Sequence, residues 1–395
     1  MKITSVKATD LLFRHPEPFE SCLFPGVQNE TFDVTLLEVT TDEGITGYSS
    51  NRDRWWDDPH RFSLSQPSYS KQIIDTYVSR DLIGKDPFAI GEHMARLIRG
   101  LRMFHGYPWF VEFALWDIVG KASGLPISRL WGSGREQIRA YASTAGLYNP
   151  SEMAGKLQPL LDRGFTAIKL RAHRADYRDD LVAMEAARDA VGPDVALMVD
   201  ANQSNMPAYG LIPGAERTPV WDYRTALAFG KGVAALDFEW YEDPLPGMNM
   251  SGLAELRSRL DIPIAGAETE IGTKRYRELL QRECFDIVQP DAAFSGGMLE
   301  AFKVGALAEA YGVQCVPHIW GAPHSVAANL QLAAALPNCQ WMECPHDPPG
   351  YPVEVRDALL AETLGPDPEG QVTVPQGPGL GVDVDWDAVE MYRVA

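Results

Sequence analysis

The chain has 395 residues, of which 45% are hydrophobic and 23% charged, as in an ordinary globular protein long enough for two domains. Its formal net charge of −19 argues against nucleic-acid binding, because contacts to phosphates need clustered lysine and arginine. No apolar run approaches the roughly 18 residues of a membrane helix. The five cysteines are scattered and form no zinc or redox pair, so we expect a cytoplasmic protein with reduced thiols.

The first 130 residues combine strand-like alternation with helical spacing, and they predict an α+β unit. The strands are expected at residues 2–13 and 33–50, and the helices at residues 68–80, 87–102 and 108–123. Two stretches without periodicity, residues 14–31 and 50–60, are longer than ordinary loops, and such segments commonly serve function.

Seven short apolar runs that each end in a polar residue dominate the rest of the chain. The seven polar residues are Lys169, Asp200, Glu242, Glu268, Asp291, His318 and Glu343, at intervals of 23 to 42 residues. This spacing, with helical segments between the runs, predicts strand–helix repeats that close into a barrel, with residues 138–143 as the first strand. Chemistry in such barrels occurs at the carboxyl ends of the strands, so these residues are expected on one active face, below an insertion at residues 205–220.

Helices between the apolar runs are predicted by apolar spacing and by residues suited to helix ends. Ser251 and Thr273 are expected to cap helices at residues 253–260 and 276–280. After Glu343 the chain is rich in proline, and we expect this tail to return to the N-terminal unit.

Asp200, Glu242 and Glu268 are carboxylates at three consecutive strand ends. Carboxylates that converge on one point repel each other, and a hard divalent cation removes that cost. A set of oxygen ligands in an open site favours Mg²⁺, which keeps positions for substrate or water. Each acid alone could be a solvated loop residue, but the three together predict a magnesium site.

Lys169 and Arg171 are two residues apart on a predicted strand, so their side chains share a face. If that face lines the barrel, both reach its active end, although a structural lysine or arginine is common at strand ends. His173 continues the same parity and is a minor candidate for substrate binding, with a loop role as the favoured alternative.

Asp291 and His318 lie at adjacent predicted strand ends. An aspartate that accepts a hydrogen bond from one imidazole nitrogen fixes the tautomer and raises the pKa of the histidine, which makes it a better general base. His324 and His346 are rivals by proximity only. Glu343, in phase with the other strand ends, is expected to contact the substrate, with a place at the rim of the barrel as the alternative.

With these residues assembled, nearly the whole chain resembles the enolase superfamily and, within it, the subgroup of mandelate racemase and muconate lactonizing enzyme. The segments that carry the resemblance are residues 112–126, 200–203, 240–244, 266–269, 286–291 and 377–381. The resemblance implies a capping domain over residues 1–130, a modified (β/α)₇β TIM barrel over residues 131–350, and a segment over residues 351–395 that returns to the capping domain.

The resemblance also implies the chemistry, which is abstraction of a proton α to a carboxylate with one essential Mg²⁺. It implies that Asp200, Glu242 and Glu268 hold the metal. It places Lys169 in a Lys-x-Lys motif, Asp291 and His318 in a His–Asp dyad, and Glu343 at the substrate carboxylate.

The chain departs from the family pattern at Arg171, which stands in place of the second lysine of that motif. In members that racemise their substrate, this lysine is the base on one face and the dyad histidine serves the other. Arginine is a poor acid–base group at neutral pH, because its pKa is above about 12. Stereoinversion needs two competent bases, whereas dehydration needs one base and an acid, so we expect a dehydratase of the acid-sugar type. A racemase, epimerase or cycloisomerase is the alternative.

The expected substrate is a sugar acid, and the expected product is a 2-keto-3-deoxy acid. His318 would remove the α-proton and then protonate the leaving 3-hydroxyl, while Mg²⁺ and Lys169 stabilise the enediolate and Arg171 holds a substrate oxygen. The opposite assignment, with another base and His318 only as the acid, stays open.

Further substrate contacts are expected from Asn202 and from the capping-domain residues Arg52, Trp55 and Trp56, although the two tryptophans could equally pack between the domains. A non-catalytic protein that binds a metal and a sugar acid is a third hypothesis. It would need a lost base, and the presence of the dyad argues against it. The family tends to assemble, so we expect a homo-oligomer.

Overall fold

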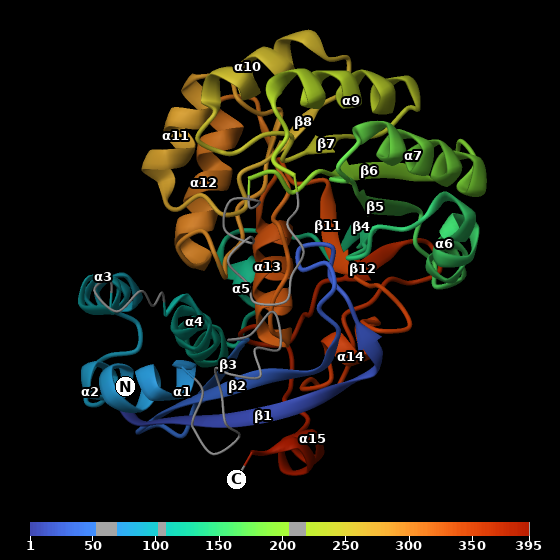
Figure 1. Ribbon diagram of the computed structural model, residues 1–395. Coiled ribbons are helices and arrows are strands. Elements are labelled where there is room, and N and C mark those ends of the chain that lie inside the picture. The colour runs from blue at the N-terminus through green and yellow to red at the C-terminus, as the bar shows by residue number, and fades with distance from the viewer. Residues whose placement is uncertain (53–68, 102–107, 205–218, 395) are drawn as a thin grey trace.

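The computed structural model describes residues 1–52, 69–101, 108–204 and 219–394. A small antiparallel sheet with its helices lies against a parallel barrel that is surrounded by helices (Figure 1). In the part of the chain that the structure describes, no helix has the length and apolar character needed to cross a membrane.

The N-terminal part is a three-stranded antiparallel sheet in the order β1-β2-β3, followed by helices. Its elements are β1 (Ile3–Phe19), β2 (Asn29–Thr41), β3 (Thr46–Asn51), α1 (Tyr69–Ile73), the π-helix η1 (Ile74–Val78), α2 (Ser79–Leu82), α3 (Ile90–Leu101), α4 (Trp109–Ser123) and α5 (Ile127–Leu130). Helix α4 packs on β3, where a Cβ atom on Gly47 would lie 2.0 Å from the Ala114 carbonyl oxygen, so only glycine fits.

The irregular stretch predicted at residues 14–31 is shorter in the structure. Strand β1 continues to Phe19 and β2 begins at Asn29, with Arg14 paired to Thr31. The alternation of buried and exposed side chains continues through His15 but is interrupted by exposed Pro16 and Pro18, and these prolines hid the strand from the sequence pattern.

Within the described residues, the barrel contains eight parallel strands in the order β11-β4-β5-β6-β7-β8-β9-β10, with seven α-helices between them in the chain. This is the predicted (β/α)₇β arrangement. The strands are β4 (Gln137–Ser143), β5 (Ala167–Arg171), β6 (Ala196–Asp200), β7 (Tyr241–Glu242), β8 (Ile264–Gly266), β9 (Ile287–Val288), β10 (Gln314–Cys315) and β11 (Trp341–Pro345). The helices are α6 (Met153–Asp162), α7 (Tyr177–Val191), α9 (Tyr223–Ala235), α10 (Met250–Arg259), α11 (Thr273–Gln281), α12 (Met298–Ala310) and α13 (Pro323–Ala335), with the 3₁₀ helix η3 (Pro150–Glu152) before α6.

A layer of apolar side chains fills the barrel, one from each strand or its immediate neighbour. The layer is formed by Tyr141, Ala167, Met198, Trp240, Ala265, Ile287, Val316 and Trp341. Because these side chains fill the barrel interior, the polar groups at the carboxyl ends of the strands lie in a pocket that is closed at its base, and not in an open channel.

Both predicted helix caps were wrong. Helix α10 begins earlier than expected, and the Asn249 side chain accepts a hydrogen bond from the Gly252 N–H. Helix α11 includes Thr273 as its first residue, after Gly272. The sequence pattern located both helices but missed which residue precedes the first turn of each.

The C-terminal segment contains α14 (Val353–Arg356), β12 (Gln371–Thr373) and α15 (Trp386–Tyr392). Strand β12 pairs antiparallel with β4 of the barrel. The end of the chain reaches β1, beside which α15 lies (Figure 1), and the Val394 N–H donates to the Asp10 carbonyl oxygen at 2.9 Å. We propose domain limits after residues 130 and 350, as predicted from the sequence.

Candidate active site

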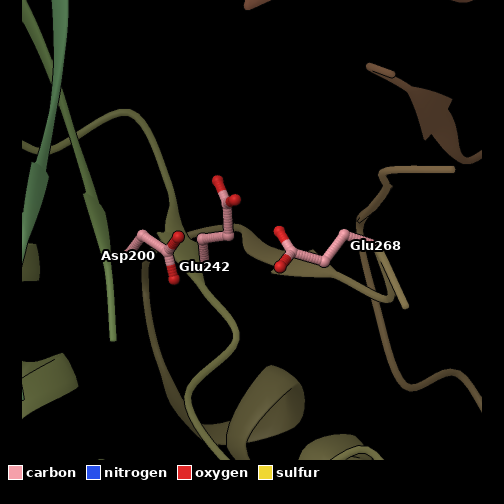
Figure 2. A group of neighbouring side chains, drawn as sticks. All are labelled: Asp200, Glu242 and Glu268. Carbon is pink, nitrogen blue, oxygen red and sulfur yellow. The ribbon is translucent and has the colours of Figure 1, made fainter. Parts of the chain in front are cut away.

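Three carboxylates point toward one another at the carboxyl ends of neighbouring strands (Figure 2). Asp200 ends β6 and Glu242 ends β7, where the two residues are paired in register, and Glu268 lies two residues beyond β8. All three are buried, and one oxygen of each lies within 4.8 Å of the others. The parallel register therefore brings together residues that are 68 positions apart in the chain.

Neighbouring polar groups orient these carboxylates. Glu242 Oε2 accepts hydrogen bonds from Trp240 Nε1 and Gln289 Nε2, both at 2.9 Å. Asp200 accepts from the backbone N–H and from the side-chain Nδ2 of Asn202, both at 2.7 Å. Asn202 has a φ of 49°, a left-handed conformation that asparagine tolerates, and this turn carries its amide back to Asp200.

Lys169 lies fully buried between the carboxylates. Its Nζ is 2.6 Å from Glu242 Oε1 and 2.8 Å from Glu343 Oε1, and 3.9 Å from Asp200 Oδ2. Burial lowers the pKa of Lys169, but Glu242 and Glu343 outweigh it and hold the pKa above its usual range, so the ammonium stays charged.

Glu343 supports this ammonium from β11. Burial raises its pKa, but the charges of Lys169 and His318 outweigh that effect and lower the pKa to about 2. Its second oxygen accepts a hydrogen bond from the Ile319 N–H at 2.7 Å. Glu343 thus joins two strand ends, and it does not line the cavity described below.

Arg171 is fixed at the end of β5 by several hydrogen bonds. Its Nε donates to the Thr144 carbonyl oxygen at 2.7 Å and its Nη2 to Ser143 Oγ at 2.9 Å, while its Nη1 donates to Asp200. Burial opposes its charge, but Asp200 outweighs this and raises the pKa of Arg171 further. The guanidinium is therefore a permanent charge and cannot exchange protons with a substrate.

His318 and Asp291 form a dyad beyond the ends of β9 and β10. His318 Nδ1 is 2.8 Å from Asp291 Oδ2, and its Nε2 is 3.2 Å from Glu268 Oε2. Asp291 Oδ1 accepts from Asn329 Nδ2 at 2.9 Å, which fixes the carboxylate. Burial lowers the pKa of His318, but Glu268, Glu343 and Asp291 raise it to about 10.

A cavity of about 220 Å³ opens above these groups. Arg171, Asn202, Glu268 and His318 line its floor. The N-terminal part supplies most of the opposite wall, namely Phe19, Ser21, Cys22, Leu23, Phe24 and Arg52. The cavity therefore has a polar end at the barrel and a mainly apolar wall on the N-terminal side.

The predicted substrate contacts outside the barrel have different outcomes. Arg52 lines the cavity, and its guanidinium lies 4.7 Å from the centre of the Phe32 ring and 5.5 Å from that of Tyr351. Trp55 and Trp56, like most of the insertion after β6, lie outside the described residues.

The three other histidines considered from the sequence are buried and lie outside the cavity lining. His173 Nε2 is 3.0 Å from the Cys22 carbonyl oxygen, and His324 Nδ1 is 2.9 Å from Ser50 Oγ. His346 Nδ1 accepts a hydrogen bond from the Val353 N–H at 3.0 Å. Each imidazole therefore joins two segments of the chain.

The sequence pattern missed several residues of the cavity and its supports. Trp320 and Phe294 line the cavity, and Ser143 and Thr144 hold Arg171. Ser143 and Thr144 lie at the end of the first predicted barrel strand and could have been found by extending the strand-end rule. Cys22 gave no signal, because it lies between strands in a segment without periodicity.

Comparisons with known proteins agree with this architecture. Residues 14–132 match the family model of the mandelate racemase / muconate lactonizing enzyme N-terminal domain, and residues 152–388 match the enolase C-terminal domain-like model. The D-galactarolactone cycloisomerase of Agrobacterium fabrum is 30% identical, over 100% of this chain and 99% of its own. The arabinonate dehydratase of Saccharolobus solfataricus is 31% identical, over 93% of this chain and 92% of its own.

A solved structure extends the comparison to the metal. The crystal structure of D-glucarate dehydratase from Agrobacterium tumefaciens, complexed with magnesium, has 27% identity and a TM-score of 0.80. The alignment covers all of both chains.

Proposed function

The chain belongs to the mandelate racemase / muconate lactonizing enzyme family of the enolase superfamily, and we propose that it is a magnesium-dependent sugar-acid dehydratase, a hydro-lyase. Two of the relatives named above, arabinonate dehydratase and D-glucarate dehydratase, are dehydratases of sugar acids. The substrate we propose is a carboxylate with hydroxyl groups on C2 and C3.

The charges at the strand ends fit a divalent cation. The buried strand ends hold five carboxylates, those of Asp200, Glu242, Glu268, Asp291 and Glu343, but only two permanent cations, Lys169 and Arg171. Burial, and then the charge of Glu242, raises the pKa of Asp200 to about 7 against the opposing charges of Arg171 and Lys169, so a further cation would stabilise its ionised form. Asp200, Glu242 and Glu268 would hold Mg²⁺, which would supply positive charge for the substrate carboxylate during proton removal.

The protein's own residues would then move the proton. His318 lines the cavity, and its Nδ1–H donates to Asp291, so Nε2, 3.2 Å from Glu268 Oε2, is the atom that would take the hydrogen from C2. The charge of Glu268 raises the pKa of His318, so Nε2 would become free to act as a base only when that charge is compensated. The Lys169 ammonium stabilises the negative charge that develops on the carboxylate oxygens. His318 next gives its proton to the departing 3-hydroxyl, water leaves, and the resulting enol becomes the 2-keto-3-deoxy acid.

The observation that carries this proposal is the fixed position and permanent charge of Arg171. A racemase of this family uses two bases on opposite faces of the substrate, and the residue at the second position here donates to Asp200, Ser143 and Thr144. One histidine suffices for dehydration, because it acts as a base and then as an acid. A cycloisomerase is the second candidate, since the A. fabrum relative matches the full length of the chain.

The test is a screen of sugar acids and their lactones, with and without Mg²⁺. Keto-acid product trapped with semicarbazide, only when Mg²⁺ is present, supports a dehydratase. Consumption of a lactone without any keto acid indicates a cycloisomerase. Deuterium exchange at C2 with an inverted product and no keto acid indicates a racemase and contradicts the proposal.

We further propose a homo-oligomer in the cytoplasm. The support is the family's tendency to assemble and the five cysteines, which are all buried and free in the structure.

A further inference from the structure

One short segment forms much of the cavity wall opposite the barrel. We call residues 19–24, from the last residue of β1 into the connection to β2, the cap segment, and five of its six residues line the cavity. It is partly bonded to itself, because the Phe24 N–H donates to the Ser21 carbonyl oxygen at 2.9 Å. A self-bonded turn still needs contacts with the barrel to keep the wall in place.

Cys22 provides contacts of this kind, to three successive strand-end loops of the barrel. Its N–H donates to the Ala145 carbonyl oxygen, after β4, at 2.7 Å. Its own carbonyl oxygen lies 3.0 Å from His173 Nε2, after β5. Its thiol lies 3.8 Å from Asn202 Oδ1, after β6. The contact with His173 pairs a buried backbone oxygen with a side chain. That side chain can be changed by mutation.

The protonation state and the burial of the His173 imidazole suit it to donate this hydrogen bond. A carbonyl oxygen can only accept, so Nε2 carries the hydrogen. Burial lowers the pKa of His173 to about 4, against the opposing effect of the Cys22 carbonyl, so the ring is neutral and Nδ1 has no proton. His173 is only 1% exposed, so its ring cannot leave Cys22 for water without opening the surrounding loops.

We propose that His173 is a positioning residue that fastens the cap segment over the cavity through the Cys22 carbonyl, and so sets substrate affinity and not the rate of the chemical step. Without this donor the Cys22 carbonyl oxygen would be buried without its partner, and the cap segment would open to recover a hydrogen bond from water. The kinetic part of this inference rests on the proposed function, whereas the opening itself does not.

The rate at which the Cys22 thiol is chemically modified reports the opening of the cap segment, and this measurement requires no substrate. Cys22 is 5% exposed, and burial raises the pKa of its thiol to about 12, so it should react slowly with a maleimide. In His173→Phe, which keeps a ring without a donor, modification of Cys22 should become roughly tenfold faster, the factor that about 1.4 kcal/mol gives and that one hydrogen bond can supply. His173→Gln, which keeps a donor, should restore slow modification.

The other four cysteines are internal controls, because Cys284, Cys315, Cys339 and Cys344 are buried elsewhere. Peptide mass spectrometry separates the five sites. An unchanged Cys22 rate in folded His173→Phe overturns the proposal. If all five thiols of the variant react, the variant has unfolded and does not test the contact. In that case the wild-type protein is labelled instead, at urea concentrations below its unfolding transition. Labelling of Cys22 ahead of the other four supports the proposal, and simultaneous labelling overturns it.

The kinetic arm separates positioning from a general structural role. His173→Phe should raise KM about tenfold and leave kcat within about twofold, with His173→Gln close to wild type. A fall in kcat at constant KM contradicts the inference. If no sugar acid is turned over by the wild-type protein, the proposed function fails while the labelling result still decides the role of His173.

Discussion

Two clusters of buried charge meet at neighbouring residues of β11, and they differ in how their charges are balanced. Glu343 belongs to the strand-end cluster, where it holds Lys169. The next residue, Cys344, faces the other side of the strand, where its sulfur accepts from Arg356 Nη1 at 3.0 Å. Arg356 is paired with Asp357, with Nε–Oδ1 at 2.7 Å and Nη2–Oδ2 at 2.5 Å.

The pair formed by Arg356 and Asp357 is neutral overall and well bonded. The backbone of Leu364 completes it, because its carbonyl oxygen accepts from Arg356 and its N–H donates to Asp357. The strand-end cluster instead has more carboxylates than cations and borders a cavity. Buried charge that is balanced attracts no further ion, whereas an excess of one sign beside a cavity is able to bind an ion of the other sign.

The sharpest test of this difference is removal of one excess charge with Glu268→Gln. We expect activity to fall by roughly 10⁴-fold, because a metal ion supplies several kcal/mol in such reactions. Calorimetry should show loss of Mg²⁺ binding, while urea unfolding of the metal-free protein should show no loss of stability. The matched control is Glu136→Gln, which changes the same charge at a 68% exposed position and should leave both properties unaltered. Retention of Mg²⁺ binding in Glu268→Gln would break the comparison.

A second test addresses the base in the same cluster. His318→Asn should fold and still bind Mg²⁺, because His318 is not one of the three carboxylates, but kcat should fall about 10³-fold, within the range for loss of a general base. Kinetic assays and calorimetry measure the two properties. His346→Asn, in a buried histidine outside the cavity lining, is the control and should keep kcat. Near-normal turnover by His318→Asn would remove this residue from the mechanism.

The balanced pair should respond in the opposite way. Asp357→Asn leaves the Arg356 charge buried without its partner, so the free energy of unfolding should fall by about 3–5 kcal/mol. The fraction that stays folded should keep its kcat. Glu390→Gln breaks a pair whose side chains are 70% and 43% exposed and should cost less than about 1 kcal/mol, as urea titrations can show. A large loss of kcat with unchanged stability in Asp357→Asn would contradict the structural role.

The smallest expected effect concerns Glu112, a buried acid of α4 outside both clusters. Its Oε1 accepts from the Leu299 N–H of α12 at 2.9 Å, and burial raises its pKa to about 7. Since the folded state holds this proton more tightly than the unfolded state, the contribution of Glu112 to stability falls as pH rises from about 4.5 to 7. Glu112→Gln should therefore gain stability relative to wild type by roughly 2 kcal/mol between pH 5 and pH 8.

Urea titrations at a series of pH values measure that difference. An equal difference at every pH would show that Glu112 titrates alike in the folded and unfolded states, which would count against a buried, poorly compensated charge.

The amino-acid sequence by itself determined the barrel and the chemical nature of its active face. Apolar runs at a regular spacing predict strand–helix units, and parallel strands bring the residues at their carboxyl ends together whatever the exact strand lengths. Strands β9 and β10 have only two residues each, yet Asp291 and His318, three residues beyond them, form a hydrogen bond. The prediction of the strand ends did not depend on strand length, because it depends on the local periodicity of the sequence.

Only the tertiary structure decided which contacts join distant segments. Cys22 and His173 are 151 residues apart, and nothing in the periodicity of either segment indicates that they meet. Likewise the sequence contains Arg171, but only the fold shows that Ser143, Thr144 and Asp200 hold it in place. The physical reason is that such hydrogen bonds depend on the relative placement of loops, and that placement follows from the packing of the whole chain and not from local sequence.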